Sequence, residues 1–498
     1  MDYEVSSRIA DDHSDTQRPN IVLIMTDQQT YNTLGCYGNS IINTPNIDRL
    51  ASEGTVFERA YTTCPLCAPA RASFFTSLPV SGTGSPVNDD DARMIALSDS
   101  LETSGDLLKK QGYTCGYFGK WHMGREDMAQ HGFEDGWFVH LRNSFENWIE
   151  RTGQFNFPED LKGLDRRGVL PFELQQDTVV TDKSIEFIDK HKDDPFFCVC
   201  SLRAPHDPYL GPFDDLYPPE EVPLPETVQG NFEGKPFNQI ISWARKEAVN
   251  HGIENPQEFK KVIARYWGLV HLVDLNVGRL LDTLDDLALR DNTLVMFAVD
   301  HGDMMGAQGL LTKGPFMYEE TTRVPLILRY PAKVPAGKRT SELVSLLDGT
   351  PTLLDYAEVP VPSRMQGRSL RSLINQVGTN STEGTMVSWR DAVFIESYES
   401  YTQRCPIWNI TTKDWKYNYY FGDIDELYDL KNDPHEKVNR AQDPGYRQLL
   451  FEMRERLMCW ADSSLDIRLQ DVIGLAGHTV SRGYDFRFDF KTMIKKSV

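Results

Sequence analysis

The stretch from Cys64 to Ser73, CPLCAPARAS, contains the side chains with the clearest capacity for chemistry in the chain. Two cysteines three positions apart are typical of a thiol–disulfide redox site or of half a zinc site. A structural zinc site needs a second pair of cysteine or histidine ligands, and the sequence has no second Cys-x-x-Cys. A redox motif would follow a strand in a small βαβ unit, which the surrounding residues do not resemble. Both interpretations are therefore weak.

Two aspartates follow strand-like apolar runs and indicate a metal site. Asp27 ends the run 19–27 (PNIVLIMTD), and Asp300 ends the run 293–300 (TLVMFAVD). Ligands of open α/β sheets bind beyond the carboxyl ends of strands, although an aspartate in such a place is equally suited to cap the next turn. Carboxylates on adjacent strand ends are the hard donors that Ca²⁺ or Mg²⁺ prefers.

The second cysteine also begins another pattern, because Pro69 and Arg71 follow Cys67 by two and four positions. This Cys-x-Pro-x-Arg pattern resembles the signature of the type I sulfatases, which belong to the alkaline phosphatase superfamily. The resemblance implies that a maturation enzyme oxidises Cys67 to formylglycine. The hydrated aldehyde attacks sulfur through one oxygen, and its remaining hydroxyl group then expels sulfate. The family usually has serine where this chain has Ala70, and we still expect conversion, with lower efficiency.

Further segments resemble the family in the same order, so the resemblance extends from about residue 19 to residue 430. They are 19–28, 44–51 (TPNIDRLA), 112–124 with GKWHMG, 204–208 (APHDP), 299–303 (VDHGD), 312–314 (TKG) and 425–430 (DELYDL).

The resemblance implies a metal site made by five residues: Asp27, Gln28, Cys67 as formylglycine, Asp300 and His301. We expect one divalent cation, Ca²⁺, with Mg²⁺ or Mn²⁺ as alternatives. Many family members have aspartate where this chain has Gln28 and asparagine where it has His301. These changes remove one negative charge and add an imidazole, which favours a transition metal such as Mn²⁺ more than the usual ligand set does.

Five further side chains complete the site by resemblance. Lys120 and Lys313 bind the sulfate oxygens, and Lys313 shares protonation of the leaving group with His206. His122 orients the nucleophile and Arg71 holds it in place. Such preorganised cations stabilise the charge that develops in a sulfuryl transition state.

The elements that must position these residues alternate along the chain. Short apolar runs predict strands at 19–27, 114–118, 196–202, 293–300 and 324–329, and helical periodicity predicts helices at 100–111, 177–191 and 259–289. This alternation predicts an α/β fold in which helices cover both faces of a large, mostly parallel sheet, as in alkaline phosphatase. Strand-like runs at 393–395 and 415–420 and a helix at 445–459 predict a smaller C-terminal α+β domain with an antiparallel sheet.

The predicted domain boundaries follow these patterns. Residues 1–18 form a flexible N-terminal segment, 19–376 the catalytic domain, 385–465 the smaller domain and 466–498 a tail, with a linker around 375–384. In the tail, Tyr484, Phe486, Phe488 and Phe490 alternate with polar residues, which is typical of a strand. We expect the tail either to dock on its own subunit or to add a strand to a second copy and form a homo-oligomer.

Composition excludes several classes of partner. The chain has 498 residues and a formal net charge of −21, which speaks against nucleic acid and anionic membranes. No window reaches the about 18 apolar residues of a membrane span, and residues 1–18 lack the features of a signal peptide. We therefore expect a cytoplasmic protein, or a periplasmic or secreted one if a leader has been removed. Most of the eight scattered cysteines are expected to be buried free thiols.

The sequence predicts a hydrolase acting on a small anionic sulfate ester, in exo fashion on a sulfated carbohydrate. The acidic, proline-rich loop 207–236 would wall the pocket, and Trp148, Arg203, Tyr209 and Trp243 are available for recognition. The alternatives are a choline or aryl sulfatase, a phosphonate monoester or phosphodiester hydrolase of the same superfamily, and a binding protein without activity.

Overall fold

The computed structural model describes residues 18–88, 96–124, 128–137, 170–378, 388–400 and 403–464, together with residues 149, 153 and 168. The predicted tail 466–498, nearly all of the N-terminal segment and most of the predicted linker lie outside the described residues. The domain boundaries and the oligomeric role of the tail stay predictions.

The larger of two sheets is built around strand β1 (Asn20–Asp27), which lies between β5 (Phe196–Pro205) and β6 (Thr293–Val299) and is parallel to both. Next to β5 follow β3 (Thr114–Gly119) and β4 (Asp135–Trp137), again in parallel. β1 and β6 are buried along their whole length. This is the burial expected for continuous apolar runs in a parallel sheet covered on both faces.

The other side of the sheet is mixed. Residues 324–329 form β7 (Arg323–Val324) and β8 (Leu326–Arg329), and β8 is antiparallel to β6. A return in parallel needs a long crossover, usually an α-helix, whereas the segment between β6 and β7 contains only two short helical turns, the 3₁₀ helix Ala307–Gly309 and the four-residue helix α10 (Glu319–Thr322). Strand β2 (Thr55–Tyr61) pairs with β7 and β8 in antiparallel and with β9 (Lys338–Ser345) in parallel.

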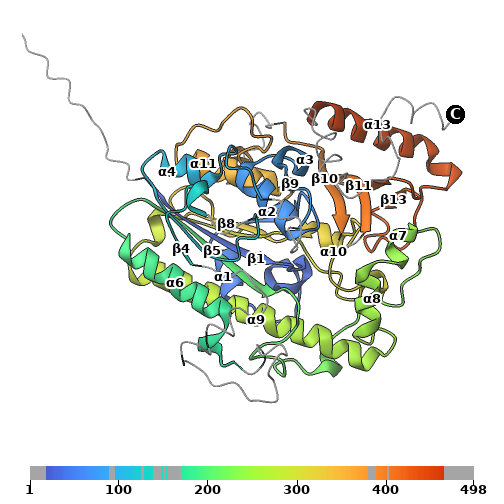
Figure 1. Ribbon diagram of the computed structural model, residues 1–498, viewed down its shortest axis with the longest axis horizontal. Coiled ribbons are helices and arrows are strands. Elements are labelled where there is room, and N and C mark those ends of the chain that lie inside the picture. The colour runs from blue at the N-terminus through green and yellow to red at the C-terminus, as the bar shows by residue number, and fades with distance from the viewer. Residues whose placement is uncertain are drawn as a thin grey trace, which may run out of the picture.

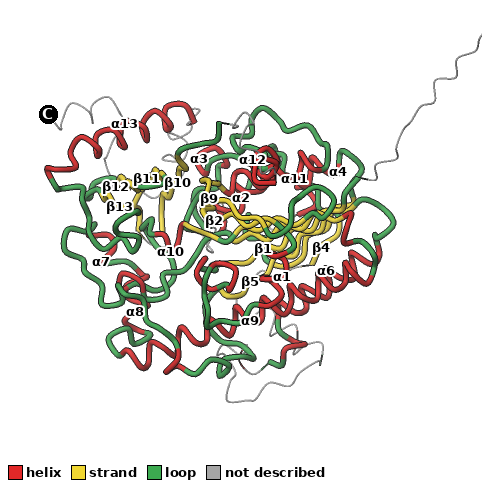
Figure 2. Tube along the Cα trace, turned by 180° about the vertical axis from the view of Figure 1, so that it is seen from behind, coloured by secondary structure: helices red, strands yellow, loops and turns green. Residues whose placement is uncertain are grey.

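Helices cover both faces of the large sheet, which confirms the predicted α/β fold class. Figure 2 shows α1 (Pro45–Ser52), α6 (Gln176–Lys190) and α9 (Pro256–Asp286) on one side. On the other side lie α2 (Cys67–Thr76), α4 (Ser104–Lys109), α11 (Gly349–Tyr356) and α12 (Arg371–Gly378). Further helices are α3 (Val80–Thr83), α7 (Phe237–Ile240) and α8 (Trp243–Asn250).

A second, antiparallel sheet forms the smaller C-terminal unit beside the first (Figure 1). Its order is β10 (Ala392–Ser400), β11 (Gln403–Thr412), β12 (Trp415–Tyr420) and β13 (Glu426–Asp429), and α13 (Arg447–Ser464) covers it. Its apolar cluster includes Trp408 and Leu457 together with Cys64 and Leu66. The small unit therefore packs against the segment that leads to Cys67.

Among the described residues, no helix has the length and apolar character needed to span a membrane. The seven cysteines whose side chains are described form no disulfide, and five of them are buried.

Candidate active site

The carboxyl ends of β1 and β6 bring predicted metal ligands together. β1 ends at Asp27, Asp300 directly follows β6, and the two strands are neighbours. Together with Cys67 and His301 these residues form a buried group whose ligand atoms all lie within 4.8 Å of one another. Cys67 Sγ is 3.5 Å from Asp27 Oδ1 and 3.0 Å from His301 Nε2. Four of the five predicted ligands thus converge on one point.

Helix α2 begins at Cys67 and presents its side chain to this group. Pro69 lies in the first turn, where a missing N–H group costs no intrahelical hydrogen bond. The N–H group of Ala68 donates to Asn88 Oδ1 at 3.0 Å, which satisfies one of the unpaired donors at the helix start. All ten residues of α2 are buried, so the position of Cys67 is fixed on every side.

Arg71 lies one turn along α2, on the same face as Cys67. Its fully buried guanidinium donates from Nε to Asp300 Oδ2 at 2.9 Å. Nη1 donates to the Lys120 carbonyl oxygen and to Ser201 Oγ, each at 2.7 Å. Arg71 therefore compensates the Asp300 carboxylate and joins α2 to the ends of three strands.

The end of β3 places Lys120 beside the same group. Gly119 has φ +100°, and a Cβ atom there would lie 1.9 Å from the Ser201 carbonyl oxygen, so the position requires glycine. The N–H group of Lys120 donates to the same Ser201 oxygen at 2.9 Å. The Lys120 ammonium forms an ion pair with Asp27 Oδ2.

His206 and Lys313 meet at the more open side of the site. His206 Nε2 is 2.8 Å from Lys313 Nζ, and Lys313 also donates a hydrogen bond to Gln28 Oε1. His206 Nδ1 is 2.7 Å from the Asp207 carbonyl oxygen, which only accepts hydrogen bonds. Nδ1 therefore carries the hydrogen and Nε2 faces Lys313. The side chains of His206 and Lys120 each keep 16% exposure, whereas Asp27, Asp300 and His301 have none.

The charges of the site shift the pKa values of its members. Burial raises the pKa of the Cys67 thiol, but Lys120, Lys313, His301 and a hydrogen bond with His122 outweigh burial and bring this pKa well below its usual value. Burial and the Cys67 sulfur also act to raise the pKa of Asp27, and nearby positive charges, Lys120 foremost, hold it low instead. The site thus stabilises negative charge on an atom at the Cys67 Sγ position.

The donor set fits a divalent cation. Two buried carboxylates provide hard oxygen donors, and His301 provides an imidazole nitrogen. An oxygen in place of the Cys67 sulfur would make oxygen donors the majority. The Gln28 side-chain oxygen accepts from Lys313, so the ligand role of Gln28 stays a prediction.

The structure adds residues that the sequence did not single out. The Tyr117 hydroxyl group donates to the Lys120 carbonyl oxygen at 2.6 Å, and Ser201 contacts both Lys120 and Arg71. Tyr209, expected to be available for substrate recognition, is only 5% exposed and donates to Asp303 Oδ2 at 2.8 Å. Asp303 belongs to the stretch VDHGD, and this is the only feature of the sequence that could have drawn attention to the contact between Tyr209 and Asp303.

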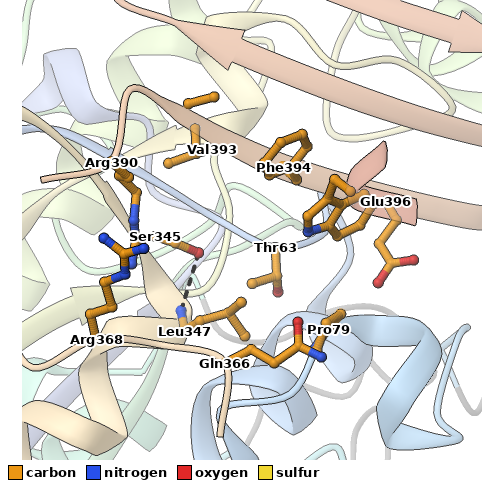
Figure 3. A pocket seen from close by; sticks show the side chains of 12 residues that line it. Thr63, Pro79, Ser345, Leu347, Gln366, Arg368, Arg390, Val393, Phe394 and Glu396 are labelled. Carbon is orange, nitrogen blue, oxygen red and sulfur yellow. Dashed lines mark hydrogen bonds between the residues drawn. The ribbon is translucent and has the colours of Figure 1, made fainter. Parts of the chain in front are cut away.

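A separate cavity of about 250 Å³ lies where β10 and α13 meet the segment around Thr63 (Figure 3). Arg368, Arg390, Phe394 and Glu396 contribute to its lining, whereas none of the predicted site residues does. The cavity is therefore distinct from the group around Cys67.

Comparisons with known proteins agree with this geometry. The sulfatase family model matches residues 19–359, and the model described as N-sulphoglucosamine sulphohydrolase, C-terminal, matches residues 306–462. The chain is 28% identical to N-acetylglucosamine-6-O-sulfatase of Bacteroides thetaiotaomicron, over 89% of this chain and 86% of that protein. It is 31% identical to an arylsulfatase of Clostridium perfringens, over 89% and 94% of the two chains.

A solved structure that contains the substrate D-glucosamine-2-N,6-O-disulfate superposes with a TM-score of 0.75 at 26% identity. The superposition covers 91% of this chain and 99% of the other. The similarity therefore includes both sheets.

Proposed function

The chain belongs to the sulfatase family, and we propose that it removes sulfate from a sulfated carbohydrate with Cys67 converted to formylglycine and with one divalent cation bound. The observation that carries the proposal is the position of Cys67 Sγ, 3.0 Å from His301 Nε2 and 3.5 Å from Asp27 Oδ1 in a buried group of potential metal ligands. A sulfatase is a hydrolase, and the similarity to named sulfatases covers most of the chain.

The sulfur of Cys67 represents the place that an oxygen of the hydrated formylglycine would take. Formylglycine supplies a nucleophilic hydroxyl and a second hydroxyl that later releases sulfate. His122 hydrogen-bonds at this position. Arg71 Nη2 is buried and has no hydrogen-bond partner among the described residues, so it keeps a donor on the face of α2 that carries residue 67. These two residues hold the nucleophile.

Lys120 and Lys313 supply positive charge for the sulfate oxygens. Their ammonium groups already lie beside Asp27 Oδ2 and Gln28 Oε1, respectively, so both are oriented before substrate binds. Charge that is positioned in advance needs no reorganisation as negative charge develops, which is why it lowers the barrier.

His206 and Lys313 form the proton donor for the leaving group. Because the hydrogen on His206 Nδ1 is held by the Asp207 carbonyl oxygen, Nε2 is the nitrogen that exchanges a proton with Lys313 and the leaving oxygen. The 2.8 Å contact between these nitrogens places both groups within reach of one oxygen.

Asp27, Asp300, His301 and the modified residue 67 would hold the cation, with Gln28 as a further ligand. Ca²⁺ is the proposed ion because carboxylate oxygens dominate the set. Bound there, the cation would supply Lewis-acid chemistry toward the sulfate group.

The carbohydrate substrate is supported by relatives whose names or titles specify sulfated sugars. The test is sulfate release by enzyme co-expressed with a formylglycine-generating enzyme, with Cys67→Ala as control. N-acetylglucosamine 6-sulfate, an aryl sulfate, choline sulfate and a phosphonate monoester are compared at equal concentration. We expect the sugar to have the highest kcat/KM. Faster turnover of choline sulfate, the aryl sulfate or the phosphonate would contradict the carbohydrate, and no sulfate release from any ester by converted enzyme would contradict the function.

A further inference from the structure

Asp303 is a buried carboxylate to which the mechanism above gives no role. Its side chain has no exposure. Oδ1 accepts hydrogen bonds from the N–H groups of Met305 and Thr312, both at 2.9 Å. Oδ2 accepts from the Tyr209 hydroxyl group at 2.8 Å and from Gln28 Nε2 at 2.5 Å. One side chain thus connects the loops that follow β1, β5 and β6.

These donors are neighbours of the proposed acid–base groups. Thr312 immediately precedes Lys313, Tyr209 follows His206 by three positions, and the Gln28 side chain contacts Lys313 directly. The influence of Asp303 on Lys313 and His206 therefore passes through the groups that it holds.

The backbone around Asp303 is strained. Gln28, Met305 and Thr312 have φ values of 63°, 42° and 64°, in the left-handed region that residues other than glycine rarely adopt. Such conformations persist where surrounding contacts fix them. All three residues donate a hydrogen bond to Asp303, which makes this carboxylate a common anchor for them.

Gln28 Nε2 donates to Asp303 Oδ2 at 2.5 Å and, over a longer distance of 3.4 Å, to Asp207 Oδ1. The chemistry of the shorter contact fixes the direction of the Gln28 amide. A carboxylate oxygen offers only acceptors, so the Gln28 amino group must face Asp303. The amide carbonyl then faces the Lys313 ammonium, which offers only donors. We propose that Asp303 is a positioning residue, which orients the Gln28 amide so that its carbonyl oxygen holds the Lys313 ammonium beside His206. The inference rests on the roles proposed above for Lys313 and His206.

Asp303→Asn tests the orientation with almost no change in shape. Oδ1 of the introduced asparagine still accepts from the two backbone N–H groups. Its Nδ2, however, now faces Gln28 Nε2, and two amino groups that both donate cannot form a hydrogen bond with each other. The Gln28 amide relieves this conflict by rotating, and its amino group then faces Lys313. Because a misplacement of about 1 Å at a catalytic group costs about 100-fold, we expect kcat to fall about 100-fold, with a much smaller rise in KM because Lys313 also faces the sulfate oxygens.

The double variant Asp303→Asn/Gln28→Glu separates orientation from simple loss of structure. In it, Nδ2 of the introduced asparagine donates to one oxygen of the introduced glutamate, and Lys313 donates to the other. The acceptor for Lys313 is restored, so we expect kcat to recover at least about tenfold over Asp303→Asn. A merely structural role predicts that the second change adds a further loss.

Asp348→Asn is the control for the loss of a buried carboxylate. Asp348 is also fully buried and accepts from the N–H groups of Ser345 and Arg368, and it forms an additional ion pair with Arg390. It lies outside the active site, so we expect a lower melting temperature and an unchanged kcat. Gln28→Met removes the carbonyl acceptor without changing Asp303, and we expect it to reproduce the loss in kcat at saturating Ca²⁺.

The proposal is overturned if folded Asp303→Asn keeps kcat within about threefold of the parent enzyme, or if the folded double variant is no more active than Asp303→Asn. If Asp303→Asn does not fold, Gln28→Met decides the question. The proposal is overturned if Gln28→Met has the same kcat as the parent enzyme, or if excess Ca²⁺ restores the kcat that Gln28→Met has lost. If the converted parent enzyme releases no sulfate, the proposed function fails instead. In that case a crystal structure of Asp303→Asn tests the positioning role of Asp303. The role requires that Lys313 Nζ no longer contacts Gln28 in this variant, and an unchanged contact would refute it.

Discussion

Replacing Arg71 by methionine removes a buried cation but keeps most of the side-chain volume. Arg71 Nε and Asp300 Oδ2 are 2.9 Å apart and neither side chain is exposed. Removing one partner of such a pair leaves an uncompensated buried charge and costs about 3–5 kcal/mol. The three other partners of Arg71, Tyr117, Lys120 and Ser201, add little, because the Tyr117 and Ser201 hydroxyl groups still donate to the Lys120 carbonyl oxygen at 2.6 and 2.7 Å.

This loss converts into a measurable change in melting temperature. At about 2.1 cal/mol/K per residue, a domain the size of residues 19–359 has an unfolding entropy of about 0.7 kcal/mol/K. A loss of about 3–5 kcal/mol therefore lowers the melting temperature by about 4–7 °C. The difference in melting temperature between Arg71→Met and the parent enzyme is measured by thermal scans at one fixed rate, once with chelator and once with excess Ca²⁺. We expect Ca²⁺ to raise the melting temperature more in Arg71→Met than in the parent, because a cation beside Asp300 replaces the missing charge.

Arg339→Met is the control for the loss of an arginine as such. Arg339 Nε is 2.8 Å from Glu58 Oε1, but both side chains are more than a third exposed, and such pairs contribute less than about 1 kcal/mol. If Arg339→Met destabilises the protein as much as Arg71→Met, or if Arg71→Met melts like the parent, the reasoning about the buried charge is wrong.

Three further predictions concern the nucleophile, the cation and pH. We expect Cys67→Ala to abolish sulfate release and Cys64→Ala to retain it. Peptide mass mapping of active enzyme should find residue 67 as formylglycine, in which one oxygen replaces the sulfur and two hydrogens of cysteine. An unmodified Cys67 in active enzyme would refute this prediction. We expect chelation to remove activity and Ca²⁺ to restore it, and we expect Asp300→Asn to require more Ca²⁺ for half-maximal activity. Activity that survives exhaustive chelation would refute the requirement for a bound cation. Burial raises the pKa of Glu436 from 4.5 to about 8, so the folded state holds this proton more tightly than the unfolded state. Stability therefore falls as pH rises from 4.5 to about 8, and Glu436→Gln flattens this part of the melting-temperature profile; an unchanged slope contradicts the role of Glu436.

Part of the fold could be predicted because burial on both faces leaves a plain pattern. The run 19–27 corresponds to β1, Asn20–Asp27, and the run 415–420 coincides with β12. Strands β2 and β9 were not predicted, because their sequences, TVFERAY and KRTSELVS, mix charged and apolar residues. Such strands owe their pairing to long-range contacts rather than to local pattern.

The candidate site was predictable to the extent that each residue follows a strand or begins a helix. Asp27, Lys120, His206 and Asp300 all lie at carboxyl ends of neighbouring strands, where the topology of a parallel sheet collects them. The contact between Gln28 and Asp303 joins residues 275 positions apart. Spacing along one sequence contains no information about such a pair, so the orientation of Gln28 required the structure.

The acidity of the whole chain and the cationic character of its site act over different distances. Surface charges more than about 10 Å apart are largely screened at physiological salt, so we expect the net charge of −21 to have little effect on a sulfate group once it lies at the proposed position beside Lys120 and Lys313. Buried charges a few ångströms apart interact several times more strongly than the same charges in water. The net charge acts earlier, on approach, and its repulsion grows with the charge of the substrate. We therefore expect a small sugar with one or two sulfates to reach the site more readily than a densely sulfated polymer, and we expect this difference to narrow as ionic strength rises.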